Sequence, residues 1–184
     1  MRWIPFAILV YLVIQLQTTV GKVLTVQQTA IGPIGPDLAA IVAAFLAIHL
    51  RGAADVGLAC WALGLAVDLA TGSGVGAVTK VGPMALTYGL AGMVVYRMRD
   101  AFFRERIVSQ ALLALAFAGT AHLLWVFLQV MLVGQWRFWW GATQQAVALA
   151  VYTALAAPLG YRLLERVQRW VILAPMGRGR RMRR

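Results

Sequence analysis

Six apolar segments limit this chain to one class of fold. They cover about residues 3–20, 37–50, 53–69, 78–96, 107–133 and 141–164, and an α-helix needs about 20 apolar residues to cross a bilayer. The second segment is short, so we expect it either to thin the bilayer locally or to begin upstream as irregular chain that protein covers. The sequence therefore predicts an all-α integral membrane protein with six transmembrane helices.

The composition supports this class. Of the 184 residues, 61% are hydrophobic and only 12% are charged, which is more apolar surface than a soluble domain of this size could bury. The first segment lacks a small-residue cleavage site and further segments follow it, so we expect a retained helix and not a signal peptide. Cys60 is the single cysteine and excludes a disulfide framework. We expect one membrane domain over residues 1–173 and a basic tail over residues 174–184.

The basic residues predict the orientation of the chain. A net charge of +11 is typical of nucleic-acid partners, but the basic residues flank the apolar segments and form no patch on a polar domain, so no nucleic acid is predicted. With the N-terminus inside, all of the 17 basic residues except Lys22, Lys80 and Arg137 face the cytoplasm. The positive-inside rule then places both termini in the cytoplasm, with the basic groups near anionic lipids.

The sequence contains no recognisable catalytic motif. It has no P-loop, no HExxH pattern and no nucleophile elbow, and neither His49 nor His122 has a carboxylate at ligand spacing. We therefore predict no catalytic residue, no metal site, no cofactor and no enzymatic activity. His122 lies near the middle of the fifth segment, where it is either a buried, hydrogen-bonded contact between helices or part of a polar pathway.

Small residues predict that the third and fourth segments pack closely as a hairpin. At 100° per residue, small side chains fall on one face of each segment, and such faces let helix backbones approach closely. The face of the third segment ends at Asp68, and the hairpin would turn around residues 72–76. The small residues are Ala53, Gly57, Cys60 and Gly64 on the third segment, and Gly82, Ala85, Gly89 and Gly92 on the fourth.

Two carboxylates stand out. Asp37 follows Pro36 and is a natural N-cap for the second segment. Asp68 is the carboxylate that falls most clearly inside an apolar segment, where a charge costs about 2.5–3.5 kcal/mol at a helix centre and less near an end. Two interpretations of Asp68 remain open: it caps the turn and pairs with Lys80, or it organises a surface for a partner or ligand.

Residues 36–106 resemble the bacterial rod shape-determining protein MreD family. The resemblance rests on the Pro36-Asp37 opening, the Leu50-Arg51-Gly52 step, and the run from Gly64 to Gly76. That run matches the family's Gly-x-x-x-Asp-Leu-x-x-Gly-x-x-x-Gly signature, with Thr71 where the family often has serine. The candidate structural or partner-binding residues are Pro36, Asp37, Gly57, Gly64, Asp68, Gly72, Gly76 and Lys80.

The resemblance implies a non-enzymatic scaffold of the cell-elongation (rod) complex in the bacterial cytoplasmic (inner) membrane. Its expected partner is an MreC-like protein, and through it an MreB-like filament, a RodA-like glycosyltransferase and a class B penicillin-binding transpeptidase. Such a scaffold helps control cell shape and peptidoglycan synthesis.

The resemblance also implies a particular fold, that of the substrate-binding components of energy-coupling-factor vitamin transporters, with an outward-facing pocket. The alternative function is therefore a substrate-binding subunit of such a transporter. Asp68, Lys80, Trp136 and Arg137 are the groups expected at the outer mouth of its pocket.

Overall fold

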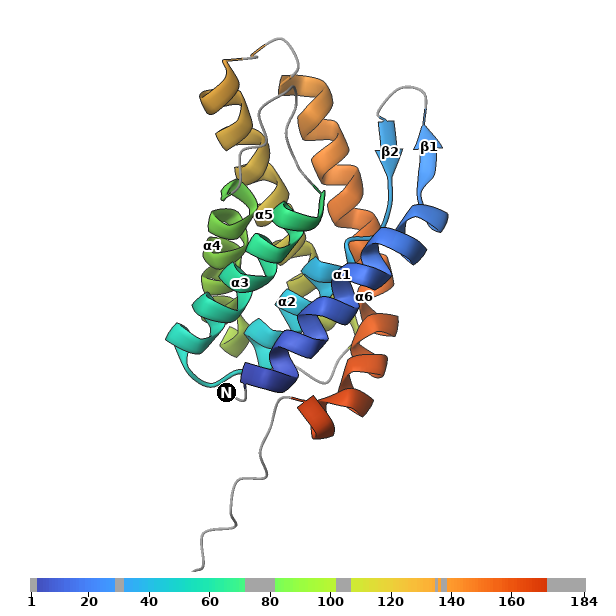
Figure 1. Cartoon of the computed structure of the whole chain (residues 1–184). Helices are drawn as coiled ribbons and strands as arrows, with labels where there is room; N and C mark the ends of the chain where they lie inside the picture. The colour runs from blue at the N-terminus through green and yellow to red at the C-terminus, as the bar shows by residue number, and fades with distance from the viewer. Residues whose placement is uncertain are drawn as a thin grey trace, which may run out of the picture.

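Six α-helices and a short β-hairpin make up the described part of the chain. The computed structural model describes residues 3–28, 32–71, 82–101, 107–134, 136 and 139–171. The α-helices are α1 (Trp3–Val23), α2 (Leu38–His49), α3 (Ala53–Thr71), α4 (Pro83–Met98), α5 (Ile107–Val133) and α6 (Trp139–Val171) (Figure 1). A 3-10 helix, η1 (Arg99–Ala101), follows α4.

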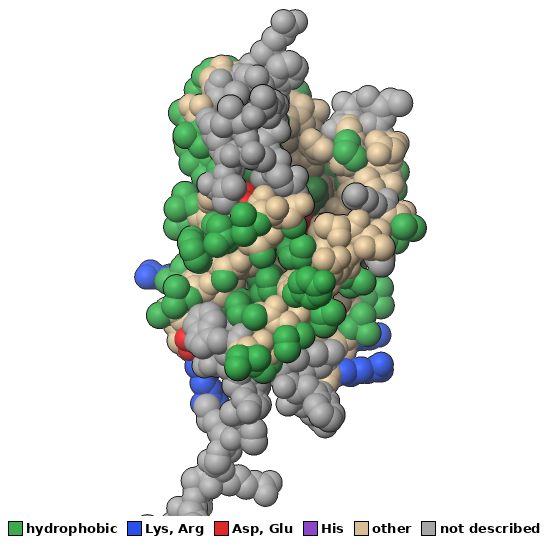
Figure 2. Space-filling model, viewed as in Figure 1, with side chains coloured by type: hydrophobic (Ala, Val, Ile, Leu, Met, Phe, Trp, Pro, Cys, Tyr) green, Lys and Arg blue, Asp and Glu red, His purple; other side chains and the backbone are tan. Residues whose placement is uncertain are grey.

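Three of these helices contain stretches that are long and apolar enough to cross a membrane. The stretches are Ala53–Ala70 in α3, Ile107–Leu132 in α5 and Trp139–Arg166 in α6. The apolar stretches of α1 (Ile4–Thr19) and α2 (Leu38–His49) are shorter. Figure 2 shows a largely hydrophobic surface, with most of the coloured Lys and Arg side chains toward the lower end. The predicted helical fold is thus confirmed for the described residues, and three of its six α-helices are long and apolar enough to cross a membrane.

The α2 helix forms the centre of the fold. Every residue from Ala39 to Ile48 is buried, and α2 packs against each of the other five α-helices (Figure 1). Its alanine-rich sequence explains this position, because small side chains let five neighbours come close. The α2 helix has 12 residues and is therefore only about 18 Å long. It starts inside the bundle, because Ala39 and Ala40 in its first turn are buried. The chain just before it is non-helical, and Pro36 and Asp37 are buried there, as the second alternative for the short segment predicted.

The connection between α1 and α2 contains a β-hairpin, which was not predicted from the sequence. Strands β1 (Val26–Gln28) and β2 (Gly32–Ile34) pair antiparallel, with Val26 opposite Ile34. The amide nitrogen Nε2 of Gln145 on α6 donates to the backbone oxygen of Pro33 at 3.1 Å. The hairpin is thereby tied to the end of α6 away from the start of α1 (Figure 1).

The α3 and α4 helices pack as the close hairpin that their small residues predict. A Cβ atom on Gly64 would lie 2.4 Å from the backbone oxygen of Met84 and 2.8 Å from Cα of Ala85. Further along the pair, a Cβ on Gly92 would lie 2.6 Å from Sγ of Cys60. The α4 helix begins at Pro83, with Gly82 at its N-cap at φ +126°, and residues 78–81 of the predicted fourth segment lie outside the described residues.

The two ends of the helical chain lie together. The first turn of α1 and the last turn of α6 are at the same end of the molecule (Figure 1). The α6 helix continues without a break past the predicted end at residue 164 to Val171, with Pro158 inside it. Residues 165–171, which follow the predicted sixth segment, therefore continue the same helix.

One arginine contradicts a prediction made from the sequence. Arg97, Arg99, Arg104 and Arg106 were interpreted as one group facing anionic lipid, but Arg99 is buried. Its Nη1 donates to the backbone oxygens of Ala47, Ile48 and Leu50 at the C-terminus of α2. A cation at a helix C-terminus is favourable because the last carbonyls lack partners within the helix. Arg99 therefore fixes α4 and η1 to the central helix.

Candidate functional site

Asp37 caps the buried start of α2. The backbone of Asp37 is extended, with φ −87° and ψ 97°, and its Oδ1 accepts from the backbone nitrogen of Ala40 at 3.0 Å. Gly35 and Pro36 precede it and prevent the helix from continuing upstream. The cap predicted from the sequence is therefore confirmed. The partial positive charge of the α2 N-terminus stabilises this carboxylate inside the bundle.

The second carboxylate oxygen of Asp37 receives hydrogen bonds from two other helices. The hydroxyl of Tyr88 on α4 donates to Oδ2 at 2.5 Å, and Nε2 of His122 on α5 lies 3.0 Å from the same atom. All three side chains are buried. The ring of Tyr88 is held edge-on against Phe117, with 5.3 Å between ring centroids. A carboxylate, an imidazole and a phenol thus meet in the interior.

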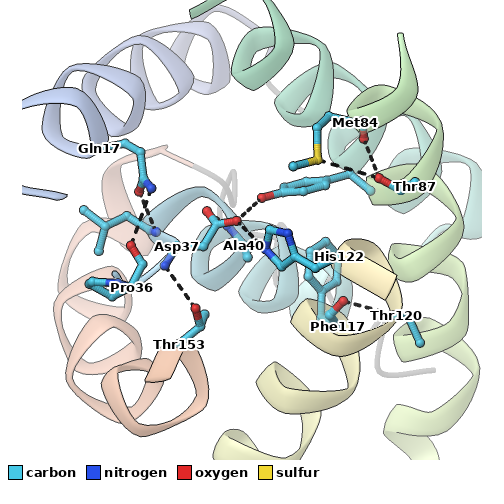
Figure 3. A network of polar contacts seen from close by, with 12 residues as sticks. Gln17, Pro36, Asp37, Ala40, Met84, Thr87, Phe117, Thr120, His122 and Thr153 are labelled. Atoms are coloured by element: carbon cyan, nitrogen blue, oxygen red, sulfur yellow. Dashed lines mark hydrogen bonds and ion pairs between the residues drawn. The ribbon is translucent and has the colours of Figure 1, made fainter. Parts of the chain in front are cut away.

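The backbone at the start of α2 is bonded by side chains from two further neighbours, α1 and α6. Thr153 on α6 accepts from the backbone nitrogen of Asp37 at 3.0 Å. Gln17 on α1 accepts from the backbone nitrogen of Leu38 at 2.7 Å and donates to the backbone oxygen of Pro36 at 3.4 Å. Figure 3 shows these bonds converging on Asp37. We call this set of side chains the Asp37 centre, and it consists of Gln17, Asp37, Tyr88, His122 and Thr153.

The Asp37 centre was only partly visible in the sequence. His122 was expected to be either a buried hydrogen-bonded contact or part of a polar pathway, and its bond to Asp37 confirms the contact. The identity of its partner was missed, because the two residues are 85 positions apart in the chain. Tyr88 and Thr153 were missed altogether. Their signal was that each is a polar side chain inside an apolar segment.

A cavity of about 460 Å³ lies against the Asp37 centre. Asp37 and His122 form part of its wall, together with residues of α1, the stretch from Pro33 to Pro36, α3, α4 and α6. Two other hollows on the surface are lined almost entirely by apolar side chains, one of them between α1 and α3. Unlike those two hollows, this cavity has a buried carboxylate and a buried imidazole in its wall.

Asp68 has a different role, at the junction of α3 and α4. It is 1% exposed, and its Oδ2 accepts from the backbone nitrogens of Gly82, Met84 and Ala85 at 2.9, 3.0 and 3.3 Å. Gly82 occupies the N-cap position of α4 and has no side chain to cap it. Asp68 therefore supplies the missing cap from the neighbouring helix. The capping interpretation is confirmed, and the pairing with Lys80 falls outside the described residues.

The remaining candidate residues divide between these two places and the undescribed turn. Pro36 lies beside Asp37 at the cavity, and Gly57 lies with Gly64 on the α3 face that meets α4. Gly72, Gly76 and Lys80 lie outside the described residues, as does Arg137. Two of the groups expected at the outer mouth of the pocket are described. Asp68 caps α4, and Trp136 is exposed near Trp139, with ring centroids 6.4 Å apart.

The described residues contain no group of three or more His, Cys, Asp or Glu side chains that could hold a metal ion. His49 lies at the opposite end of α2 from His122, stacked on Phe45. The chemistry available at the Asp37 centre is that of one buried carboxylate with two side-chain donors. It can hold a proton or a positive charge. No protein-family model, curated protein or solved structure matches this chain.

Proposed function

We propose that this chain is an MreD-like scaffold of the bacterial cell-elongation complex, without enzymatic activity of its own. One observation carries the proposal. Two residues of the signature, Gly64 and Asp68, act together at one junction: Gly64 admits the backbone of Met84, and Asp68 caps the same turn of α4. The sequence resemblance therefore falls on a structural unit and not on scattered residues.

The proposed topology has six spans, with both termini in the cytoplasm of a bacterial inner membrane. Its support is the position of the described arginines. Four exposed arginines lie at the ends of helices. Arg51 follows α2, Arg97 is near the end of α4, and Arg162 and Arg166 belong to the last part of α6. These helix ends are at the end of the molecule where α1 starts (Figure 1). Positive charge concentrated at one end of a helical membrane protein is expected on the cytoplasmic side.

The proposed mechanism is contact between transmembrane helices within the bilayer. Exposed large apolar side chains cover the outer faces of several helices, where they meet either lipid or a partner helix. In the proposal one such face binds an MreC-like protein, which links the chain indirectly to an MreB-like filament, a RodA-like glycosyltransferase and a class B transpeptidase. Examples are Ile8 and Leu12 on α1, Leu58 and Trp61 on α3, Leu86 and Leu90 on α4, and Leu155 and Leu159 on α6.

Co-purification tests this proposal directly. The chain is co-expressed with the MreC-like protein of its own genome, and the complex is captured in nanodiscs, with an unrelated single-span membrane protein as control. We expect capture of the MreC-like protein alone, and rounding or lysis of a rod-shaped host when the chain is depleted. A chain that captures neither protein, in a host that keeps its shape on depletion, would refute the scaffold function.

The cavity at Asp37 favours a second candidate, the substrate-binding subunit of an energy-coupling-factor type vitamin transporter. Its volume of about 460 Å³ lies within the range of small-molecule sites. Of the groups first expected to hold a ligand, Asp68 and Trp136 do not line this cavity, and Lys80 and Arg137 lie outside the described residues. Native mass spectrometry against a panel of vitamins separates the two functions, because a tightly bound vitamin supports the transporter and its absence with intact capture supports the scaffold.

A further inference from the structure

The wall of the Asp37 cavity offers hydrogen-bond acceptors and one negative charge. Asp37 lines the cavity, its Oδ1 receives one hydrogen bond and its Oδ2 receives two. A carboxylate accepts about four hydrogen bonds, so Asp37 retains the capacity for one more. When Nε2 of a neutral His122 donates to Asp37, its other ring nitrogen is also an acceptor.

The other polar side chains of the wall point the same way. The hydroxyl of Thr18 donates to the backbone oxygen of Gln15 at 3.0 Å, and that of Thr25 donates to the oxygen of Gly21 at 2.8 Å. Because both protons are already used, the two oxygens present lone pairs. Gln17 is engaged at both its oxygen and its nitrogen. The described wall contains no Lys or Arg side chain.

These features select a cation over an anion. The N-terminus of α2 would attract an anion, but the carboxylate of Asp37 already occupies it. The buried carboxylate of Asp37 lies in the cavity wall, and a bound cation would balance its negative charge. The volume of about 460 Å³ is far larger than a bare ion needs, and Val67, Ala70, Met84 and Leu149 line the rest of the wall. The site fits a charged group on an apolar stem.

We propose that this cavity binds a primary ammonium group at Asp37, carried by a free organic amine or by the headgroup of an aminophospholipid. An ammonium brings three donors and one positive charge to a wall of acceptors. The apolar part of the ligand lies against the side chains of α3, α4 and α6. This inference goes beyond the scaffold function and does not depend on it.

Three probes of equal length and different charge test the free amine. The melting temperature of the chain is measured in phosphatidylcholine nanodiscs with n-hexylammonium, 1-hexanol or hexanoate. We expect hexylammonium at ten times its dissociation constant to raise the melting temperature by about 3 °C or more, and the other two probes to have no comparable effect. A second series in phosphatidylethanolamine nanodiscs tests the headgroup, which should raise the melting temperature by itself and make hexylammonium ineffective.

A matched pair of variants links the effect to this cavity. Thr18→Lys places a built-in ammonium in the cavity from a half-buried position on α1, and Thr18→Met adds similar length without charge. We expect the stabilisation to disappear in Thr18→Lys and to persist in Thr18→Met. The proposal is overturned if neither series shows stabilisation by the ammonium, if hexanoate stabilises equally, or if the effect survives in Thr18→Lys. An effect in one series alone identifies the source of the ammonium.

Discussion

Asp37 and Asp68 are both buried carboxylates beside helix N-termini, yet Asp37 lies at a cavity and Asp68 at the junction of two helices. Asp68 on α3 accepts hydrogen bonds from three backbone nitrogens at the start of the neighbouring α4, so it joins two helices. Asp37 caps its own helix and also binds side chains of α4 and α5 at a cavity. The position of a carboxylate within an apolar segment is therefore a poor guide to the side chains that it binds. Asp68 stood out in the sequence, but the polar side chains of other helices converge on Asp37.

Replacing each carboxylate by alanine should give the largest difference. Asp37→Ala removes an N-cap, worth about 1 kcal/mol, and leaves the buried donors of Tyr88 and His122 without an acceptor, at about 1–3 kcal/mol each. We expect a loss of about 3–7 kcal/mol in the free energy of unfolding, measured by denaturation in mixed micelles. Asp68→Ala should cost about 1–3 kcal/mol, because the α4 turn it caps is only partly buried. An equal or larger loss in Asp68→Ala would contradict the distinction.

Gly64 tests whether the junction at Asp68 depends on close backbone contact. In Gly64→Ala the new Cβ would meet the backbone of Met84 at 2.4 Å, which forces α3 and α4 apart. We expect a loss of about 1–3 kcal/mol, the usual cost of overpacking, seen as a lower melting temperature in detergent. Gly57→Ala is the matched control on the same face, because its nearest neighbour is Sδ of Met93 at 3.7 Å. It should be neutral or stabilise slightly, since alanine favours the helix.

The junction of α3 and α4 could be predicted from the sequence because its signals are local. Gly64 and Asp68 share one helix face at a spacing of one turn, and the partner helix follows directly in the chain. The helical class and most helix bounds were accessible for the same reason, since apolar segments of this length favour helices. The hairpin was missed because strands of three residues carry too little pattern to recognise.

The Asp37 centre could not be assembled from the sequence. Its partners are 51, 85 and 116 positions away from Asp37, on three different helices, and no local spacing relates them. Arg99 was misread for a similar reason: near a helix end it resembled its exposed neighbour Arg97, and only the packing of α4 against α2 distinguishes the two. Both errors arise because burial of the central helix is a property of the whole bundle.

Asparagine substitutions separate charge from shape at the two sites. Asp37→Asn keeps a good N-cap but puts an amide nitrogen in the place of Oδ2, the acceptor for both Tyr88 and His122. The hydroxyl of Tyr88 can turn and accept from the amide, which leaves the His122 donor without an acceptor, at about 1–2 kcal/mol. Asp68→Asn keeps an acceptor for α4 and loses the attraction of a charge for the helix dipole, at about 0.5–1 kcal/mol. We therefore expect Asp37→Asn to lower the melting temperature more than Asp68→Asn does.

Asp68→Asn also tests whether Asp68 contacts a partner. Its side chain is buried by α4, so the folded variant should capture the MreC-like partner as well as the wild type does. Weaker capture by a variant of unchanged melting temperature would show that Asp68 belongs to a partner surface, and the contrast with Asp37 would then fail.

A smaller effect than that of Asp37→Ala is expected at the backbone of the Asp37 centre. Thr153 accepts from the backbone nitrogen of Asp37 across the interface between α2 and α6, and Thr153→Val keeps the branched shape while removing this acceptor. We expect a loss of about 1 kcal/mol in the free energy of unfolding, because a buried N–H is left without a partner. Thr143→Val is the control on the same helix. Its hydroxyl donates to the oxygen of Trp139 one turn earlier, so its loss should cost less than about 0.5 kcal/mol. Equal losses would mean that water from the cavity reaches the nitrogen of Asp37, and the Asp37 centre would then be hydrated where the Asp68 junction is closed by backbone contact.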